Sequence, residues 1–475
     1  MIGSAKGAKT TFNFAPFAEP IACFNQQGTM PTNRPGPHLE GLNAKSARSM
    51  KPKYILPIIA LVVTACTDAP GEPSPTALLA TPTSEQIGLI AADVERILEP
   101  EVSDEAITSL GGGLQGFAFD FYDQLPAEEN IIFSPYSIAQ AFSMLYAGAR
   151  GGTAEEIAAV LGFLPQGDQH PAFNRLDLQV RDQVTNPGDD AEPFELNIAN
   201  SAWTQPGFSI EQAFLETLGR HYGAGIYEVD FSSDPDAAAE RINDWVADET
   251  EERIPELLSP GFVKPTTRLV LANAIYFKGL WLSPFSPSQT AEADFTLLDG
   301  ATATVDMMHT SGNFRYTIAD GYLAASPPYR NSSTEMIVIV PDEGEFRAVE
   351  ALLSPAFLSE IPLVSAKIDL SMPRWEFESK PDLKKILTAM GMPLVFSGEA
   401  DLGGIAPGLF VGEAVHQADI AVDEEGTEAA AATAIGVEES GPVAAIIIDR
   451  PFIFIIRDFE TGAILFMGRV LNPAQ

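Results

Sequence analysis

The chain has 475 residues, of which 45% are hydrophobic, and its formal net charge is −37. Residues 1–66 contain seven Lys or Arg and two Asp or Glu, so residues 67–475 carry −42. Nucleic-acid binding needs clustered basic residues, so this charge argues against a nucleic-acid partner. Both cysteines, Cys23 and Cys66, precede the main hydrophobic region, which excludes a disulfide framework or a cysteine-based zinc site within that region.

A short segment near the N-terminus has the pattern of a secretory signal. Lys51 and Lys53 precede an apolar stretch, 54–63, which is too short to span a bilayer as a helix but suits a signal peptide. Its end, Val63-Thr-Ala-Cys66, resembles a bacterial lipobox, in which the cysteine is lipidated. We therefore expect an extracytoplasmic bacterial lipoprotein, anchored through Cys66 to the cell surface or outer membrane. Secretion without a lipid and a cytosolic protein with a buried apolar segment stay open as alternatives.

The signal-like segment divides the chain into four parts. The residues before Met50 lack hydrophobic periodicity, and we expect them to be upstream sequence, with the true start at Met50. The residues after Cys66 contain four prolines with Thr, Ser and Gly, which is typical of a flexible tether. The expected organisation is upstream sequence at 1–49, a lipoprotein-type signal peptide at 50–66, a linker at 67–85 and a single folded domain at 86–475.

The folded region mixes helical and strand patterns in a way that predicts an α+β domain. The predicted helices are 106–125, 137–149, a short helix opened by a capping box from Thr153 to Glu156 and ending near Gly162, 210–222, and 235–252 with Trp245 inside. The predicted strands are 194–204, 267–277, 336–340, 367–372 and 444–456. The strand at 267–277 is apolar almost throughout, which predicts that both of its faces are covered.

The segment 423–437 is the most informative part of the chain. It reads Asp-Glu-Glu-Gly-Thr-Glu-Ala-Ala-Ala-Ala-Thr-Ala-Ile-Gly-Val, and every second residue from Thr427 would suit the buried face of a strand. The glutamates around it indicate an exposed loop, which could join a sheet later. Alanine is also the best helix former, so the segment by itself fits a short exposed helix over 428–434 equally well.

Six segments in the right order resemble the serpin family from about Ala106 to Gln475. They are Asn130-Ile-Ile-Phe-Ser-Pro-Tyr-Ser-Ile138, Ile242-Asn-Asp-Trp-Val-Ala-Asp-Glu-Thr250, Asn273-Ala-Ile-Tyr-Phe-Lys-Gly-Leu-Trp281, Ala400-Asp-Leu402, the segment at 424–430, and Phe466-Met-Gly-Arg-Val-Leu-Asn-Pro473. The resemblance implies the serpin fold, an α+β domain with a large central mixed β-sheet, further sheets and about eight or nine helices. It also implies an exposed reactive-centre loop at about 424–443.

The resemblance assigns roles to individual residues. It implies a hinge at Glu424, Gly426, Thr427, Ala429, Ala430 and Ala431, a buried polar cluster called the shutter at Ser134, Ser137, Asn273 and His416, and a breach at Trp281 and Arg374. Insertion of the loop is expected to start at Thr427, and Glu424 could pair with Arg374. The alternatives are an ordinary core histidine at His416, core packing for Trp281 and a solvated Glu424. Counting from Glu424 gives Ser440–Gly441 as the scissile bond, or Glu439–Ser440 after a shift of one residue.

The residues give no positive signal for catalysis. The chain has five histidines and lacks a Gly-x-Ser-x-Gly elbow, a phosphate-binding loop and a dinucleotide fingerprint. The resemblance instead implies a monomeric inhibitor, without cofactor or metal, that traps serine endopeptidases by loop insertion. Ser440 at the cut would suit elastase-like or subtilisin-like proteases, Glu439 a glutamate-preferring one, and cysteine proteases are a further class. The alternative is a non-inhibitory serpin acting as a binding module, against which the small hinge residues Thr427, Ala429, Ala430 and Ala431 argue.

Overall fold

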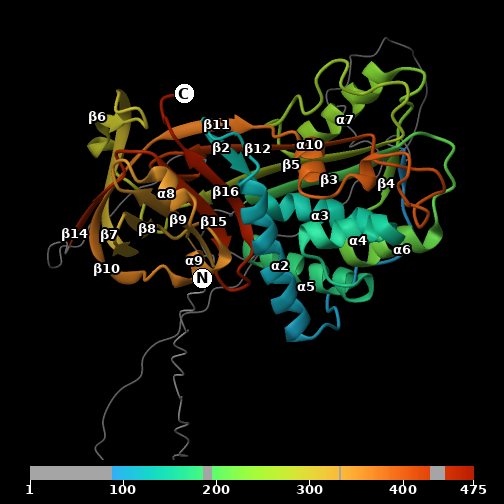
Figure 1. Ribbon diagram of the computed structural model, residues 1–475, viewed down its shortest axis with the longest axis horizontal. Coiled ribbons are helices and arrows are strands. Elements are labelled where there is room, and N and C mark those ends of the chain that lie inside the picture. Colours follow the sequence, from blue (N-terminus) through green and yellow to red (C-terminus); the bar gives the residue numbers. More distant parts are fainter. Residues whose placement is uncertain (1–87, 186–194, 331–332, 428–443) are drawn as a thin grey trace, which may run out of the picture. The chain divides into compact units, whose positions relative to one another are not determined.

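The computed structural model describes residues 88–185, 195–330, 333–427 and 444–475 (Figure 1). Within these ranges the helices are α2 (Asp104–Tyr122), α3 (Pro135–Tyr146), α4 (Gly151–Leu161), α5 (Gln166–Thr185), α6 (Gln212–Tyr222), α7 (Pro235–Glu249), α8 (Phe346–Glu350), α9 (Pro355–Glu360) and α10 (Leu383–Ala389). Short 3₁₀ turns lie at Pro287–Gln289 and Leu394–Phe396. The helices pack around two sheets, as the α+β prediction requires.

The central sheet is mixed. Its strands in spatial order are β1 (Leu89–Ile90), β4 (Ile226–Glu228), β3 (Glu195–Thr204), β5 (Leu269–Leu280), β13 (Gly426–Thr427), β12 (Glu413–Val422) and β11 (Trp375–Ser379). β5 and β12 run parallel and pair directly over Val270–Ile275 and Glu413–Ala418, while the two-residue β13 lies between their ends and runs antiparallel to both. The expected large central mixed sheet is confirmed.

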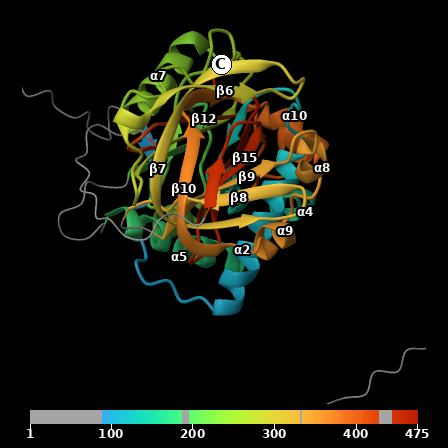
Figure 2. The ribbon, with the colours of Figure 1, turned by 90° about the vertical axis from the view of Figure 1, so that its left-hand side faces the viewer.

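A second sheet packs beside the first. Its strands follow the order β14 (Ala444–Ile447), β10 (Val364–Pro373), β7 (Thr302–Ile318), β8 (Tyr322–Ser326), β9 (Thr334–Pro341), β15 (Phe452–Asp458), β16 (Ile464–Val470) and β2 (Ile131–Phe133), with β6 (Ala291–Thr296) paired to β7. Figure 2 shows β7 and β10 as long curved neighbours, and they pair antiparallel over ten residues of β10.

The two faces of β5 are both buried, because its side chains alternate between two hydrophobic clusters. Leu271 and Ile275 belong to the large core that also contains residues of α3. Ala272 and Ala274 point the other way, into a smaller cluster with Ile242 of α7. In Figure 1, α3 and α7 accordingly lie on opposite sides of the central strands. The prediction of a strand covered on both faces is confirmed, and Asn273 falls on the face that looks toward α3.

Local sequence explains why α3 starts under the sheet. Ser134 has an extended backbone, and its hydroxyl accepts a hydrogen bond from the Ser137 backbone N–H at 3.1 Å. Pro135 follows at the first helical position, where its missing N–H costs nothing. This cap fixes both serines at the point where the helix meets β5.

Two sequence predictions are wrong in detail. The pair Thr153 and Glu156 does not open α4, which already begins at Gly151; instead their side chains accept hydrogen bonds from the backbone N–H groups of Asp401 and Leu394. The expected strand 444–456 is two strands, since the chain passes through Pro451 between β14 and β15. Proline has no N–H to donate to a ladder, so it separates them.

Two further differences concern helices. Trp245 is partly rather than fully buried, and it packs edge-on against Trp203 at 6.0 Å between ring centres. Helix α5 is missing from the predicted elements. Pro171 lies inside it, and polar residues outnumber the apolar ones that recur at Phe173, Leu176 and Val180.

Candidate functional site

The hinge segment enters the central sheet before any loop begins. Strand β13 pairs Gly426 with Leu280 and Thr427 with Gly279 on β5, and Thr427 also with Val422 on β12. Thr427 is 1% exposed. The expectation that these residues are exposed is therefore wrong, because Thr427 already lies between the two central strands. That loop insertion starts at Thr427 stays a prediction.

A tight turn holds β13 in place. The side chain of Asp423 accepts hydrogen bonds from the backbone N–H groups of Glu425 at 2.9 Å and Gly426 at 3.1 Å. Gly426 then passes so close to β5 that an added Cβ would lie 2.1 Å from the Gly279 carbonyl oxygen. Only glycine fits there, which gives a steric reason for the glycine in this hinge.

Glu424 is anchored by two side chains, which decides between the pairing and solvation alternatives. Arg374 Nε donates to Glu424 Oε2 at 2.8 Å, and Thr290 Oγ1 donates to Oε1 at 2.5 Å. Burial would raise the pKa of Glu424, but the bonds from Thr290 and Arg374 outweigh it and hold this pKa below its ordinary value. Glu424 is thus a charged, buried anchor.

Trp281 lies against the same turn. Its backbone N–H donates to the Glu425 carbonyl at 2.9 Å, and its indole Nε1 donates to the Asp423 carbonyl at 3.1 Å. Its ring stacks on Tyr329 at 4.6 Å between ring centres, and the Tyr329 hydroxyl lies 2.9 Å from Thr427 Oγ1. Trp281 therefore packs in the core and also binds the hinge backbone, so core packing and contact with the hinge are both true of this residue.

Below β13, three polar residues form a row across three adjacent strands. Asn200 on β3 is directly opposite Asn273 on β5, and Asn273 is directly opposite His416 on β12. Their side chains form two hydrogen bonds. Asn273 Nδ2 donates to Asn200 Oδ1, and His416 Nδ1 donates to Asn273 Oδ1. The row crosses the β5–β12 junction, so these strands cannot part without breaking the bond between Asn273 and His416.

The two serines at the start of α3 form hydrogen bonds with this row of residues. The Ser134 backbone N–H donates to His416 Nε2 at 3.0 Å, and Asn273 Nδ2 donates to Ser137 Oγ at 2.6 Å. Because Nε2 accepts, the imidazole is neutral, and Nδ1 carries the proton that it donates to Asn273. Burial lowers the pKa of His416 from 6.5 to about 3, in keeping with a neutral ring.

The structure thus brings Ser134, Ser137, Asn273 and His416 together in one cluster, and Glu424, Gly426, Thr427, Trp281 and Arg374 in another. Sequence reasoning missed Asn200, Gln140, Thr290 and Tyr329, which complete these clusters. No local pattern marks them, since each is defined by a strand register or by a contact between distant segments. Ala429, Ala430, Ala431, Glu439, Ser440, Gly441 and Cys66 lie outside the described residues.

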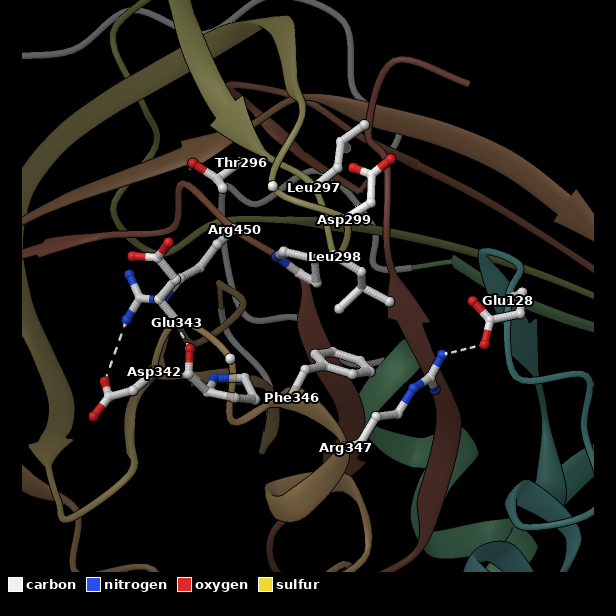
Figure 3. Close-up of a pocket in the computed structure, with 14 residues that line it drawn as sticks. Glu128, Thr296, Leu297, Leu298, Asp299, Asp342, Glu343, Phe346, Arg347 and Arg450 are labelled. Atoms are coloured by element: carbon white, nitrogen blue, oxygen red, sulfur yellow. Dashed lines mark hydrogen bonds and ion pairs between the residues drawn. The ribbon is translucent and has the colours of Figure 1, made fainter.

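A separate pocket of about 480 Å³ lies between α8, the turn from β6 to β7 and the start of β15 (Figure 3). Both of its arginines pair with carboxylates of the lining: Arg347 donates to Glu128 at 3.0 Å, and Arg450 lies 3.5 Å from Asp342. Its described lining includes Thr296 and the carboxylates of Asp299, Asp342 and Glu343, but no histidine or cysteine.

Among the described residues, no group of His, Cys, Asp and Glu side chains is arranged to hold a metal ion. In the same ranges, no helix combines the length and the apolar character needed to cross a membrane.

Comparisons with known proteins agree on one family. The family model for serpins (serine protease inhibitors) matches residues 113–473. An uncharacterized serpin-like protein of Thermococcus kodakarensis is 38% identical over 372 residues, covering 76% of this chain and 85% of that protein. The leukocyte elastase inhibitor of Equus caballus is 35% identical over 376 residues, covering 75% and 97%. The crystal structure of uncleaved ovalbumin superposes with a TM-score of 0.70 at 31% identity, covering 77% of this chain and 100% of that one.

Proposed function

Because the chain belongs to the serpin family, we propose that it inhibits serine endopeptidases by a single-use insertion of its reactive-centre loop. The observation that supports this most is the position of β13. Both of its residues pair with β5, and Thr427 also pairs with β12, at the point where these parallel strands diverge. A strand that continued from β13 would run antiparallel to both neighbours and gain ladder hydrogen bonds on each side.

The chemistry of the cut is ordinary acyl transfer. The hydroxyl of the protease's serine attacks the carbonyl carbon of Ser440, an ester forms, and Gly441 leaves as a free amine that takes up the proton. A shift of one residue would put the ester on Glu439. The freed strand then inserts before water can hydrolyse the ester, and about 14 residues at roughly 3.3 Å each would carry the protease on the order of 46 Å.

The register of β13 predicts where each inserted residue would go. Continuing both pairings along the chain places Thr433 opposite Asn273 on β5 and opposite His416 on β12. Thr433 follows Thr427 by an even number of residues, so in a continuous strand both side chains would lie on the same face. The side chain of Thr427 points into the core at Tyr329. The hydroxyl of Thr433 would therefore enter the polar row between Asn273 and His416. A threonine can donate and accept there, so the row would keep its hydrogen bonds after the strands part.

The small side chains before Thr433 fit the same path. Ala429 and Ala431 share the inward parity of Thr427, so they would pass between the sheet and α3 without steric obstruction. A charged residue at either position would have to be buried without a partner, at a cost of several kcal/mol.

The direct test is covalent trapping. The full chain is mixed with subtilisin and with pancreatic elastase, and each mixture is run on a denaturing gel beside a protease whose catalytic serine is blocked. We expect a band at the summed mass with active protease only. Mass spectrometry of the released C-terminal peptide should find Gly441 as its first residue, or Ser440 if the bond is shifted. Cleavage of the chain without a complex would refute the inhibitory function and favour a binding role.

We also propose that Cys66 carries a lipid that tethers the protein to a cell surface or outer membrane. This rests on the signal-like sequence at 50–66 and the proline-rich segment after it. Membrane fractionation of the expressing bacterium, with a Cys66→Ser variant as control, tests it. Equal release of both proteins into the soluble fraction would refute the anchor.

A further inference from the structure

A segment that precedes the family match lies along the edge of the central sheet. The match begins at residue 113, whereas β1 at Leu89–Ile90 pairs antiparallel with β4. The Gly88 carbonyl accepts from the Glu228 backbone N–H at 2.9 Å, and the Ile97 N–H donates to the Arg220 carbonyl at 2.8 Å. Residues 88–97, which we call the edge segment, are therefore held by backbone bonds at both ends.

The body of the protein is shaped to receive this segment. A Cβ added at Gly225 would lie 2.6 Å from the Ile90 carbonyl oxygen, and one at Gly219 would lie 2.6 Å from Val94 Cγ2. Side chains at these two positions would push the edge segment away. The close contact is with the backbone of Ile90 at Gly225 and with the side chain of Val94 at Gly219, so the segment is closely packed at both points.

One side chain of the edge segment reaches a buried carboxylate. Arg96 donates through Nε to Asn174 Oδ1 at 2.9 Å and through its terminal nitrogen to Asp177 Oδ2 at 2.6 Å. Asp177 on α5 is 1% exposed. It also accepts hydrogen bonds from Tyr136 at 2.8 Å and from Gln140 Nε2 at 3.0 Å, both on α3. Asp177 thus joins the edge segment to the helix beneath the sheet.

From Gln140 the hydrogen bonds continue into the polar row. Gln140 Oε1 accepts from Asn200 Nδ2 at 2.8 Å, and Asn200 Oδ1 accepts from Asn273, which binds His416. An unbroken series of side-chain bonds therefore runs from Arg96 to the β5–β12 junction. Each member fixes the orientation of the next, because an amide that donates on one side must accept on the other.

We propose that Arg96 is a positioning residue for the insertion step: by orienting Asp177 it holds Gln140 and Asn200 in place, which keeps Asn273 bonded to His416 and slows the parting of β5 and β12. The inference rests on the proposed function, since it concerns the rate at which the sheet accepts a strand. On this proposal the edge segment, which follows the proposed tether in the sequence, slows the opening of the sheet.

Arg181 provides a matched control. It also binds Asp177, with Nε at 2.9 Å from Oδ2, but it lies four residues along the same helix. Its loss removes a charge from Asp177 without freeing the edge segment. A structural effect of the charge alone would be the same for both arginines, whereas the proposed coupling is specific to Arg96.

The experiment measures sheet opening without a protease. The full chain is incubated with a synthetic peptide of residues 427–440, Thr-Glu-Ala-Ala-Ala-Ala-Thr-Ala-Ile-Gly-Val-Glu-Glu-Ser, and uptake is followed by native mass spectrometry. We expect Arg96→Gln to take up the peptide about tenfold faster than the unmodified chain, as loss of a charged hydrogen bond would allow. Arg181→Gln should change the rate less than threefold, and Arg96→Lys should restore part of the slow rate.

Two further variants test the route. Gly225→Ala displaces the edge segment without touching the polar series, so it should accelerate uptake as Arg96→Gln does. In a Gln140→Leu background, Arg96→Gln should not increase the rate of peptide uptake further, because the series of hydrogen bonds is already interrupted at Gln140. Equal uptake by Arg96→Gln and the unmodified chain, or equal acceleration by Arg96→Gln and Arg181→Gln, would overturn the inference. Neither result depends on protease trapping, so failure of the proposed function would be seen separately.

Discussion

The hydroxyl of Thr427 lies 2.9 Å from the hydroxyl of Tyr329, inside the core and beneath the central sheet. The first small residue of the loop is therefore already seated, and the remaining residues would only have to follow its register. This contact links the hinge to Trp281 as well, because Trp281 stacks on the same tyrosine ring.

A Thr427→Arg variant should lose inhibition and keep its fold. The guanidinium cannot be buried beside Tyr329 without a partner, so the two residues of β13 should leave the sheet while β5 and β12 stay paired. We expect the variant to be cut as a substrate, with the complex reduced at least tenfold on a denaturing gel. Thr427→Ser, which keeps the hydroxyl, is the control. If Thr427→Arg traps protease as the unmodified chain does, insertion does not pass through this position.

Gly426→Ala should release the hinge sterically. The added Cβ would lie 2.1 Å from a backbone carbonyl, which cannot move without distorting β5. We expect a loss of about 1–3 kcal/mol in the free energy of unfolding, which is typical of overpacking. Trp281 reports the change, since its indole binds the Asp423 carbonyl within the turn and its fluorescence should shift on release. Gly408→Ala, in an open turn with nothing near its Cβ position, is a control for strain alone.

Thr433→Val should affect only the inserted form. The variant keeps the shape of the side chain but would leave Asn273 and His416 facing a methyl group once the strand is in place. Cleavage of the unmodified chain near residue 440 should raise its melting temperature strongly. The gain should be smaller for Thr433→Val by the equivalent of about 1–3 kcal/mol, while the two intact proteins melt alike. Equal gains on cleavage would mean that Thr433 does not reach the polar row.

His416 should make the folded protein sensitive to acid. Its pKa is lowered from 6.5 to about 3, so between these values the unfolded chain binds a proton that the folded chain excludes. The stability that this group contributes is complete above pH 6.5 and is lost as pH falls toward 3. The limit is about 1.4 kcal/mol per pH unit. Denaturant melts of the unmodified chain and His416→Gln should show a flatter profile for the variant.

A second buried histidine must be counted in that experiment. Burial lowers the pKa of His170 from 6.5 to about 3 as well, with a smaller contribution from His221. Its effect has the same sign, so His416→Gln should remove only part of the acid sensitivity. A profile unchanged by His416→Gln would assign the whole effect to other groups.

Glu424→Gln should weaken the hinge anchor at neutral pH. The folded-state pKa of Glu424 lies below its ordinary value of 4.5, so its stabilising effect is complete above 4.5 and is lost as pH falls through the lowered value. About half of the Arg374 side chain is exposed, so solvent screens part of this interaction. We expect the amide hydrogens of 424–427 to be less protected from exchange in the Gln variant at pH 7, relative to their intrinsic rates. The protection in the unmodified chain should fall to that level only in acid.

The sequence predicted the strands and helices with strong periodicity but not the contacts that make the site. The apolar run at 267–277 correctly indicated a strand buried on both faces, because its pattern is local. Asn200 gave no such signal, since its role depends on lying opposite Asn273 in a register set by the whole sheet. Tyr329 likewise depends on a bridge between distant segments, from Trp281 to Tyr329.

The burial of the hinge could not be read from composition. Glu424 and Glu425 suggested an exposed loop, but the Asp423 turn and the Arg374 bond draw the segment into the sheet. The capping-box pattern at Thr153 failed for a related reason: those side chains satisfy backbone donors of a segment some 240 residues away. In both cases a long-range partner overrode a sound local rule.

Strand β13 lies between β5 and β12 and pairs with both, and the proposed insertion would extend it with the loop that follows. On the proposed mechanism a molecule that has acted is spent, because the inserted strand would be hydrogen-bonded on both sides. Its protective capacity would therefore depend on the number of copies that the cell makes and not on how tightly each one binds. A tethered population would run down as it worked and would have to be replaced by new synthesis.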